Sequence, residues 1–198
     1  MKKTLSLALL SVSLFANSAF AGNFDGMYFG GGITSSKGEW SEPGLKTSGS
    51  AEAGLNLNIG YGAEFGSFYL GGEFAHMTNI GDAGKGKLTV GRTTADVEFS
   101  GGSGNFVSLI PGYVVTPNFM VYGRVGRGNF NYEGTAKVSG QTIATTSDDG
   151  TLTFLGAGIR YNFGQKTSLV VDYMQGKSSE DGADVTTQTF NVGAQYRF

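Results

Sequence analysis

Apolar and polar residues alternate one by one along most of the chain after residue 21. Between residues 51 and 63, apolar side chains at every second position alternate with Gly, Asn and Glu. A period of two places successive side chains on opposite faces of a β-strand. We find eight such segments, at residues 27–35, 51–63, 68–77, 105–115, 120–132, 151–163, 168–176 and 185–198. No segment after residue 21 shows the 3.6-residue apolar period of a helix, so the sequence predicts an all-β fold.

The connections between these segments alternate in length. Three are short turns, at residues 63–67, 116–118 and 164–167. Four are long and rich in Gly, Ser and Thr, at residues 36–50, 78–104, 133–150 and 177–184. Short turns at one end and long loops at the other are typical of transmembrane barrels, and the segments are long enough for tilted crossings. We therefore expect an eight-stranded antiparallel up-and-down transmembrane β-barrel.

Aromatic residues should mark both ends of the predicted crossings. One set lies beside the chain termini or the short turns and predicts a girdle at one membrane interface: Phe29, Tyr61, Phe65, Phe68, Tyr113, Phe119, Tyr161, Phe163, Tyr196 and Phe198. A second set lies nearer the long loops and is a candidate for the other girdle: Phe74, Phe106, Phe130, Phe154 and Phe190. A soluble lipocalin-like barrel or β-sandwich is the alternative, but it would hide its apolar face. The glycine-rich polar face suits a narrow, filled interior instead.

The N-terminus reads as an export signal. Residues 1–21 combine a basic start, an apolar run and an Ala-x-Ala pattern at residues 19–21, as in a secretory signal peptide. The run is shorter than the roughly 20 apolar residues that a spanning helix needs. We expect cleavage after Ala21 and one barrel domain over residues 22–198.

Composition excludes several kinds of function. The chain has no cysteine, which removes disulfides, thiol nucleophiles and cysteine metal sites. Without Lys2 and Lys3 of the signal, Lys and Arg fall from 14 to 12 against 16 Asp and Glu. The resulting negative net charge predicts no basic surface that could bind nucleic acid. We expect no cofactor.

Three stretches resemble a known family of small outer-membrane barrels, which includes the OmpX/Ail adhesin group, the OmpA barrel and the opacity-type surface proteins. GNFDGMYFGGGI (22–33) is similar to the first strand of the opacity-type members, and GAGIRYNF and TSLVVDYMQG resemble their sixth and seventh strands. The resemblance implies a monomer in the outer membrane of a Gram-negative bacterium, surrounded by outer-membrane lipid and lipopolysaccharide. The terminal alternation resembles the signal that the outer-membrane assembly machinery reads, carried here by Phe190, Val192, Tyr196 and Phe198.

Charged residues fall on the polar face of the predicted strands: Glu73, Arg124, Arg160 and Asp172. Eight strands enclose a space that side chains just fill, and charges buried there must pair. We expect an interior salt-bridge network that plugs the barrel, completed by Asn56, Asn58, Asn191 and Gln195. A narrow ion path lined by the same residues is the alternative.

Two further motifs are weak. His76 is the only histidine, and no Ser or Asp lies at a spacing that reads as a catalytic triad. The stretch GDAGKGKL (81–88) departs from the phosphate-binding loop at Leu88, and no helix is predicted after it. We therefore expect no enzymatic activity.

The long loops are the candidate working surface. The second and third retain alternation, so their strands should continue past the membrane and raise a sheet with an exposed edge. Lys85, Lys87 and Arg92 could contact lipopolysaccharide phosphates, and Trp40 could anchor a protein partner. Solvated loops without a binding role are the alternative. The sequence predicts a structural or adhesive surface protein whose loops bind a host or envelope protein; a small low-conductance channel is the alternative.

Overall fold

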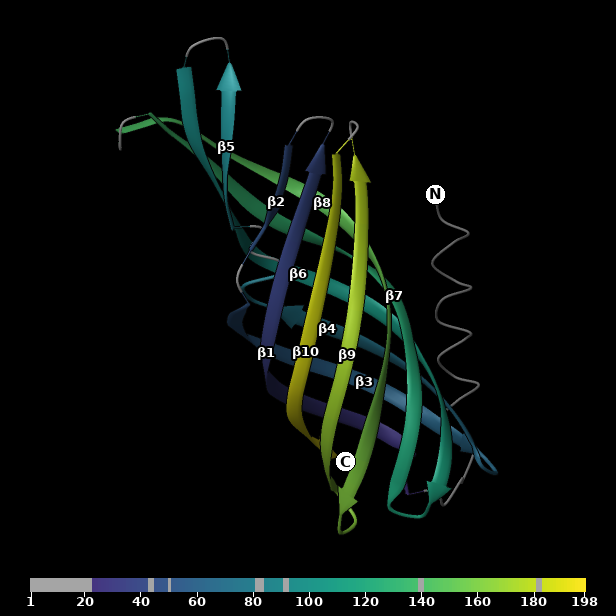
Figure 1. Ribbon diagram of the computed structural model, residues 1–198. Coiled ribbons are helices and arrows are strands. Elements are labelled where there is room, and N and C mark those ends of the chain that lie inside the picture. Colours follow the sequence, from purple (N-terminus) through teal and green to yellow (C-terminus); the bar gives the residue numbers. More distant parts are fainter. Residues whose placement is uncertain are drawn as a thin grey trace, which may run out of the picture.

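The computed structural model shows a closed antiparallel barrel (Figure 1). It describes residues 23–42, 45–49, 51–80, 84–90, 93–138, 141–180 and 183–198. Eight strands form the wall: β1 (Gly26–Glu42), β3 (Glu52–Phe65), β4 (Phe68–Met77), β6 (Thr93–Thr116), β7 (Phe119–Val138), β8 (Gln141–Phe163), β9 (Thr167–Glu180) and β10 (Ala183–Arg197). Each wall strand pairs with the next, and β10 pairs with β1 to close the barrel. The predicted fold class is confirmed.

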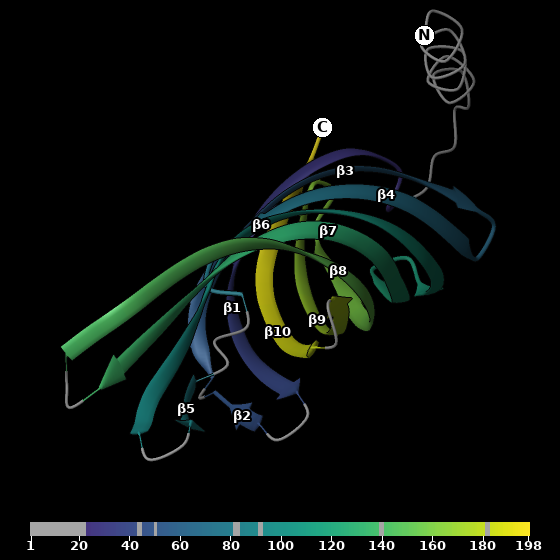
Figure 2. The ribbon, with the colours of Figure 1, turned by 90° about the horizontal axis from the view of Figure 1, so that it is seen from above.

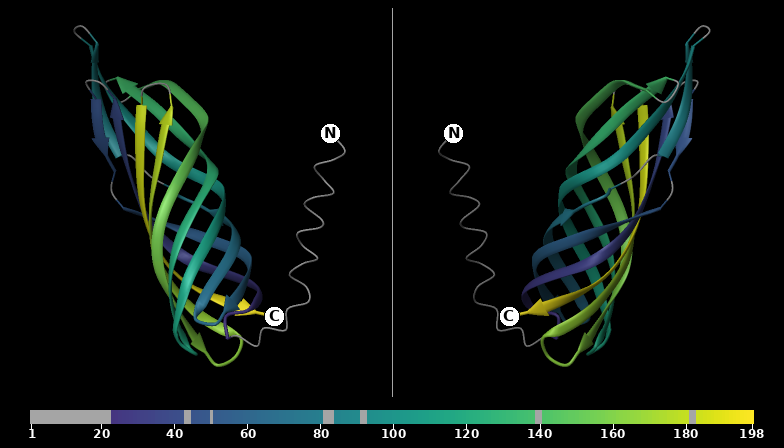
Figure 3. Two further views of the ribbon diagram at one scale, coloured as in Figure 1. Left: turned by 90° about the vertical axis from the view of Figure 1, so that its right-hand side faces the viewer. Right: turned by 90° about the vertical axis from the view of Figure 1, so that its left-hand side faces the viewer.

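Tight turns lie at one end of the barrel, and extended hairpins at the other (Figure 3). Gly66 and Gly164, in the turns after β3 and β8, adopt φ angles of 67° and 73°. This left-handed region is accessible to glycine without the penalty that a Cβ atom would bring. The C-terminal end of β10 lies at the turn end, as Figure 3 also shows.

At the opposite end the strands continue beyond the predicted crossings. Two short strands are added there: β2 (Leu45–Ser48) pairs with the end of β1, and β5 (Gly84–Val90) pairs with the start of β6. The β7–β8 hairpin extends away from the barrel wall (Figure 2). The expected continuation of the second and third loops as strands is therefore confirmed.

The first and fourth connections were wrongly predicted as long loops, at residues 36–50 and 177–184. Most of their described residues are strand, because the pairing of β1 with β10 runs without interruption up to Ser41 and Asp184. Their composition of Gly, Ser and Thr favoured loops, but a continuous ladder of backbone hydrogen bonds outweighs that weak preference.

Burial along the wall strands is the reverse of that in a soluble barrel. On β3 the polar residues Asn56 and Asn58 are buried, whereas Leu55 and Leu57 are 59% and 53% exposed. The exterior thus presents an apolar band and the interior a polar one, as a barrel surrounded by lipid requires. Among the described residues, no helix is long and apolar enough to cross a membrane.

Most of the aromatic residues predicted beside the turns do lie exposed on the outside. They include Phe29, Tyr61, Phe65, Phe68, Tyr113, Tyr161, Phe163, Tyr196 and Phe198. The second girdle was predicted wrongly for Phe106, Phe130 and Phe154, which are buried inside the barrel. Phe130 alternates in phase with the inward Arg124, and Phe154 with the inward Arg160, so both must point inward. Phe74 and Phe190 are exposed as expected.

Candidate functional site

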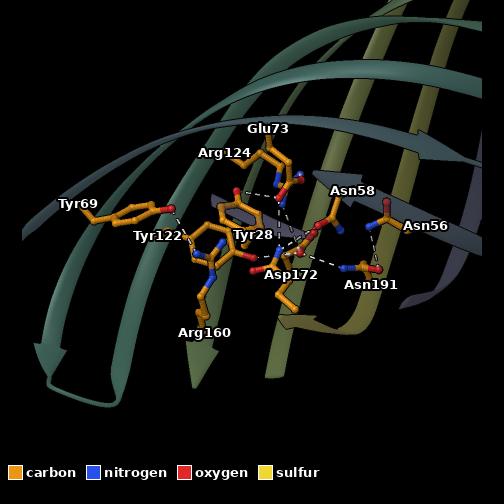
Figure 4. A network of polar contacts seen from close by, with 11 residues as sticks. Tyr28, Asn56, Asn58, Tyr69, Glu73, Tyr122, Arg124, Arg160, Asp172 and Asn191 are labelled. Atoms are coloured by element: carbon orange, nitrogen blue, oxygen red, sulfur yellow. Dashed lines mark hydrogen bonds and ion pairs between the residues drawn. The ribbon is translucent and has the colours of Figure 1, made fainter. Parts of the chain in front are cut away.

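A buried ion pair occupies the middle of the barrel (Figure 4). Nη1 of Arg124, on β7, lies 2.5 Å from Oε1 of Glu73, on β4, and both side chains are almost fully buried. Nη2 of the same arginine lies 3.9 Å from Oδ2 of Asp172, on β9. One guanidinium therefore contacts two carboxylates from different strands, and the shorter distance identifies Glu73 as its main partner.

Neutral polar groups complete the environment of Glu73. The Tyr28 hydroxyl donates to Oε2 of Glu73 at 3.1 Å, and Nε2 of Gln195 contacts the same oxygen at 3.3 Å. The Gln195 amide also donates to Oδ1 of Asn58 at 3.2 Å. This carboxylate consequently receives hydrogen bonds from β1, β7 and β10, which ties four strands together across the barrel.

Asp172 has a matching set of donors. The Tyr122 hydroxyl donates to its Oδ2 at 3.0 Å, and Nδ2 of Asn191 donates to the same atom at 3.1 Å. Nδ2 of Asn56 in turn donates to Oδ1 of Asn191 at 3.4 Å. The alternation of residues predicts both asparagines on the interior face, and the structure brings them into contact with this carboxylate network.

Arg160 lies nearer the turn end, inside a cage of three tyrosine rings. Its guanidinium carbon is 4.7 Å from the ring centroid of Tyr28, 5.5 Å from that of Tyr69 and 5.8 Å from that of Tyr122. Its Nη1 also donates to the Tyr69 hydroxyl at 3.3 Å. The faces of aromatic rings attract a cation, more strongly where water is excluded. This buried charge is thus stabilised by aromatic rings, whereas Arg124 is stabilised by carboxylates.

Glycines on β3 make room for Tyr28 and Tyr69, which lie on the two neighbouring strands β1 and β4. A Cβ atom at Gly62 would lie 2.0 Å from the Tyr69 hydroxyl, and one at Gly60 would lie 2.4 Å from the Tyr28 hydroxyl. Such distances are shorter than any real Cβ contact, so a side chain at either position would displace a ring of the cage. The glycines on the interior face of β3 therefore leave the space that the tyrosine rings of the cage occupy.

Apolar clusters lie on both sides of the polar layer. The cluster toward the long hairpins comprises Ala75, Met77, Ile80, Phe106, Phe130, Leu152, Phe154 and Met174. It surrounds a cavity of about 20 Å³, close to the volume of one water molecule. The cluster toward the turns comprises Phe24, Tyr69, Ile110, Met120, Tyr122 and Val170. Apolar side chains of the described residues thus pack both above and below the polar layer.

The first described residues close the turn end. Phe24 is fully buried, its backbone N–H donates to a Glu64 carboxylate oxygen, and its ring centroid lies 5.7 Å from the Arg197 guanidinium carbon. Nδ2 of Asn162 donates to the carbonyl oxygen of Asn23 at 2.9 Å. The segment before β1 is thereby fixed inside the barrel mouth.

The structure brings the four predicted interior charges into one region, with Arg160 beside Glu73, Arg124 and Asp172. Sequence reasoning missed the three cage tyrosines, because it read aromatic residues as membrane-facing. A signal was present, since Tyr28, Tyr69 and Tyr122 all alternate in phase with interior glycines or charges.

His76 does not take part in the interior site. It is half-buried on the outside of β4, where Nδ1 lies 3.0 Å from Oδ1 of Asn105. In the described part of the chain, no group of three or more His, Asp or Glu side chains is arranged to hold a metal ion.

The residues predicted for binding and for assembly lie on strands at the hairpin end of the barrel or on β10. Trp40 lies on β1, and Lys85 and Lys87 lie on β5, whereas Arg92 falls outside the described residues. The predicted signal segment, residues 1–21, also falls outside them. The residues predicted to direct assembly lie on or directly after β10, with Phe190, Tyr196 and Phe198 exposed and Val192 half-buried.

The closed barrel, with its apolar exterior and polar interior, is typical of outer-membrane barrels. Comparison with known families identifies the family. The sequence matches the family model of the outer membrane protein beta-barrel domain over residues 7–198. The chain belongs to this family. The family is one of outer-membrane proteins, and the apolar exterior of the barrel fits that location. Among curated proteins, no sequence match was found.

Solved structures of outer-membrane barrels share this fold. Ail, the attachment invasion locus protein of Yersinia pestis, is 21% identical, with 88% of this chain and 99% of that chain covered and a TM-score of 0.52. Neisserial surface protein A is 11% identical, with 87% and 97% covered and a TM-score of 0.48. The outer membrane protease OmpT from Escherichia coli is 10% identical, with 93% and 100% covered and a TM-score of 0.43. At these identities the likeness concerns the fold alone.

Proposed function

We propose that the protein is a surface-interaction protein in which the filled barrel is a membrane anchor. The binding surface is the raised sheet, formed by β2, β5 and the ends of β6, β7 and β8 that extend beyond the barrel wall. The part of β8 that continues beyond its pairing with β9 carries this proposal. Pairing of β8 with β9 extends only from Phe163 to Thr153, although β8 begins at Gln141. Residues 141–152 pair with β7 on one side, and no described strand covers their other side.

This edge has the chemistry of a strand-docking site. Natural edge strands are usually protected by Lys, Pro or a bulge. The register shifts at the tip near Ile143, but from Ala144 to Leu152 the pairing with β7 is regular. This stretch contains no Lys, Arg or Pro, and its only charged residues are Asp148 and Asp149. An extended segment of a partner protein, neutral or basic, could therefore add a strand there through backbone hydrogen bonds.

The interior supports the anchor role. The Glu73–Arg124 pair fills the middle of the barrel, and apolar clusters lie above and below it. A small channel is the second candidate, and one observation favours it. Several buried polar atoms, including Oδ1 of Asp172 and Oε1 of Gln195, have no hydrogen-bond partner among the described residues. Such groups are suited to contact with water, which a conducting path requires.

A matched pair of substitutions tests the docking edge. Thr145 on the free edge pairs with Thr135 on the central strand β7. Thr145→Lys places a charge on the edge, whereas Thr135→Lys places the same charge on the same hairpin without altering the edge. We expect Thr145→Lys to reduce adherence of bacteria displaying the protein to cultured epithelial cells several-fold, and Thr135→Lys to leave it near the original level. Equal effects of the two changes would contradict the edge as the binding surface.

A further inference from the structure

The apolar cavity at the hairpin end of the interior lies where β8 separates from β9. Its walls include Leu152 and Phe154 on β8, and Met174 and Gly176 on β9. Phe154 pairs with Gly176, and the pairing of the two strands ends at Thr153. The part of β8 beyond Thr153 extends away from the barrel wall (Figure 2). The cavity therefore adjoins the edge of β8 to which the proposed partner strand is added.

The alternation along β8 decides which side chains of an added strand face this cavity. Gly150 and Leu152 are buried on the interior face of β8, whereas Ser147 and Asp149 are exposed on its outer face. Directly opposite residues of an antiparallel pair have their side chains on the same face of the sheet. A partner residue opposite Leu152 therefore points toward the cavity, and one opposite Asp149 points outward.

The cavity favours a small apolar group. Its volume of about 20 Å³ is close to that of a methyl group. The absence of a side chain at Gly176 keeps its walls close together, since a Cβ atom there would lie 2.5 Å from Cδ2 of Leu152 and 2.7 Å from Oγ1 of Thr187. Its other hydroxyl group, that of Thr189, already lies 3.0 Å from the Ser36 hydroxyl. Because no charged side chain of the described residues lines the cavity, a charged group that entered it would lose its hydration without gaining a partner.

We propose that this cavity is a specificity pocket for the strand that adds to β8. It takes the terminal methyl groups of an aliphatic partner residue opposite Leu152, while a Lys or Arg of the partner contacts Asp149. In strand addition, backbone hydrogen bonds supply the affinity and pockets for alternate side chains select the sequence. The inference rests on the proposed function, because it concerns the same edge of β8.

The direction of the partner strand fixes the order of these two residues. The strand takes the place that β9 leaves, and β9 is antiparallel to β8. An antiparallel partner runs from the barrel toward the tip of the β7–β8 hairpin, so it passes Leu152 before Asp149. Its aliphatic residue therefore comes three positions before its basic residue.

The probe is a displayed library of random peptides of about ten residues, selected against the refolded protein without residues 1–21 in lipid nanodiscs. Enriched peptides should share an aliphatic residue followed three positions later by Lys or Arg. Replacing the aliphatic residue by Ala in a synthetic peptide should weaken binding by about tenfold, because its methyl groups no longer fill the cavity. This comparison uses the original protein, so it does not depend on the refolding of any variant.

Three variants separate the pocket from the edge. Leu152→Ala enlarges the pocket and should shift the preferred residue from aliphatic to Phe or Met. Leu155→Ala removes the same atoms from the outer face of β8, where Leu155 is 68% exposed, and should leave the preference unchanged. Thr145→Lys alters the edge and should weaken all enriched peptides alike.

The outcomes distinguish a failure of the pocket from a failure of the proposed function. Peptides that lose binding in Thr145→Lys but accept Ala or Asp at every position would overturn the pocket and leave the edge. An unchanged preference in folded Leu152→Ala would overturn the pocket as well, and a basic residue that precedes the aliphatic one would contradict the antiparallel arrangement. Selection of no peptide, or of peptides that bind Thr145→Lys as well as the original protein, would overturn the proposed function together with this inference.

Discussion

Replacement of Glu73 by Gln should destabilise the barrel strongly, because it leaves the buried Arg124 charge with a weaker partner. Removing one member of a buried ion pair typically costs about 3–5 kcal/mol. Asp172 still contacts Arg124, but at 3.9 Å rather than 2.5 Å, so it offsets only part of the loss. Tyr28 also loses its charged acceptor. We expect the free energy of unfolding to fall by about 3 kcal/mol, at the lower end of this range.

Equilibrium unfolding in urea, with the protein refolded into lipid vesicles, measures this change. Folded and unfolded fractions can be followed by circular dichroism and by the heat-dependent mobility of the barrel on gels. Glu133→Gln is the matched control, because it removes an exposed carboxylate on β7 and should change stability by less than about 0.5 kcal/mol. The double variant E73Q/R124Q removes both charges together. It should be less destabilised than the sum of the single variants by about 2 kcal/mol.

A loss below about 1 kcal/mol in Glu73→Gln would refute the reasoning, since it would mean that the arginine is already well solvated. Additive effects in the double variant would refute it as well, because they would show that the two charges do not interact. Either result would favour a wet interior.

Three further predictions concern the interior and assembly. Phe106→Ala should cost about 3–5 kcal/mol in the same unfolding assay, because it removes a buried ring whose centroid lies 5.7 Å from that of Phe154. Gly62→Ala should prevent refolding, measured as the heat-modifiable fraction on gels, whereas Gly72→Ala, where a Cβ meets no atom within 4 Å, should refold normally. Phe198→Ala should lower the amount of folded protein in outer-membrane fractions while the purified variant still refolds in vitro; equal effects in both assays would exclude a specific role in assembly.

The position of the interior network could be read from the sequence because alternation is a local property. Glu73 and Arg124 fall on the glycine-bearing face of their strands, and a closed barrel of eight strands brings such faces together. The same rule places Phe106, Phe130 and Phe154 inside. At these positions the phase of the alternation determines the direction of the side chain, and the aromatic residue type does not.

The raised sheet could be predicted only in part. Alternation indicated that β7 and β8 continue past the membrane, but not that β8 separates from β9 above Thr153. That separation depends on the stagger between neighbouring strands, which is a property of the whole barrel.

Single-channel conductance in a planar bilayer tests the filled interior most directly. The refolded protein without residues 1–21 should show no current steps over a range of voltages, because paired charges and two apolar clusters occupy the barrel. Reproducible steps whose ion selectivity changes on replacement of Arg124 would contradict the account, since they would show a water-filled path along the residues that are assigned here to a plug.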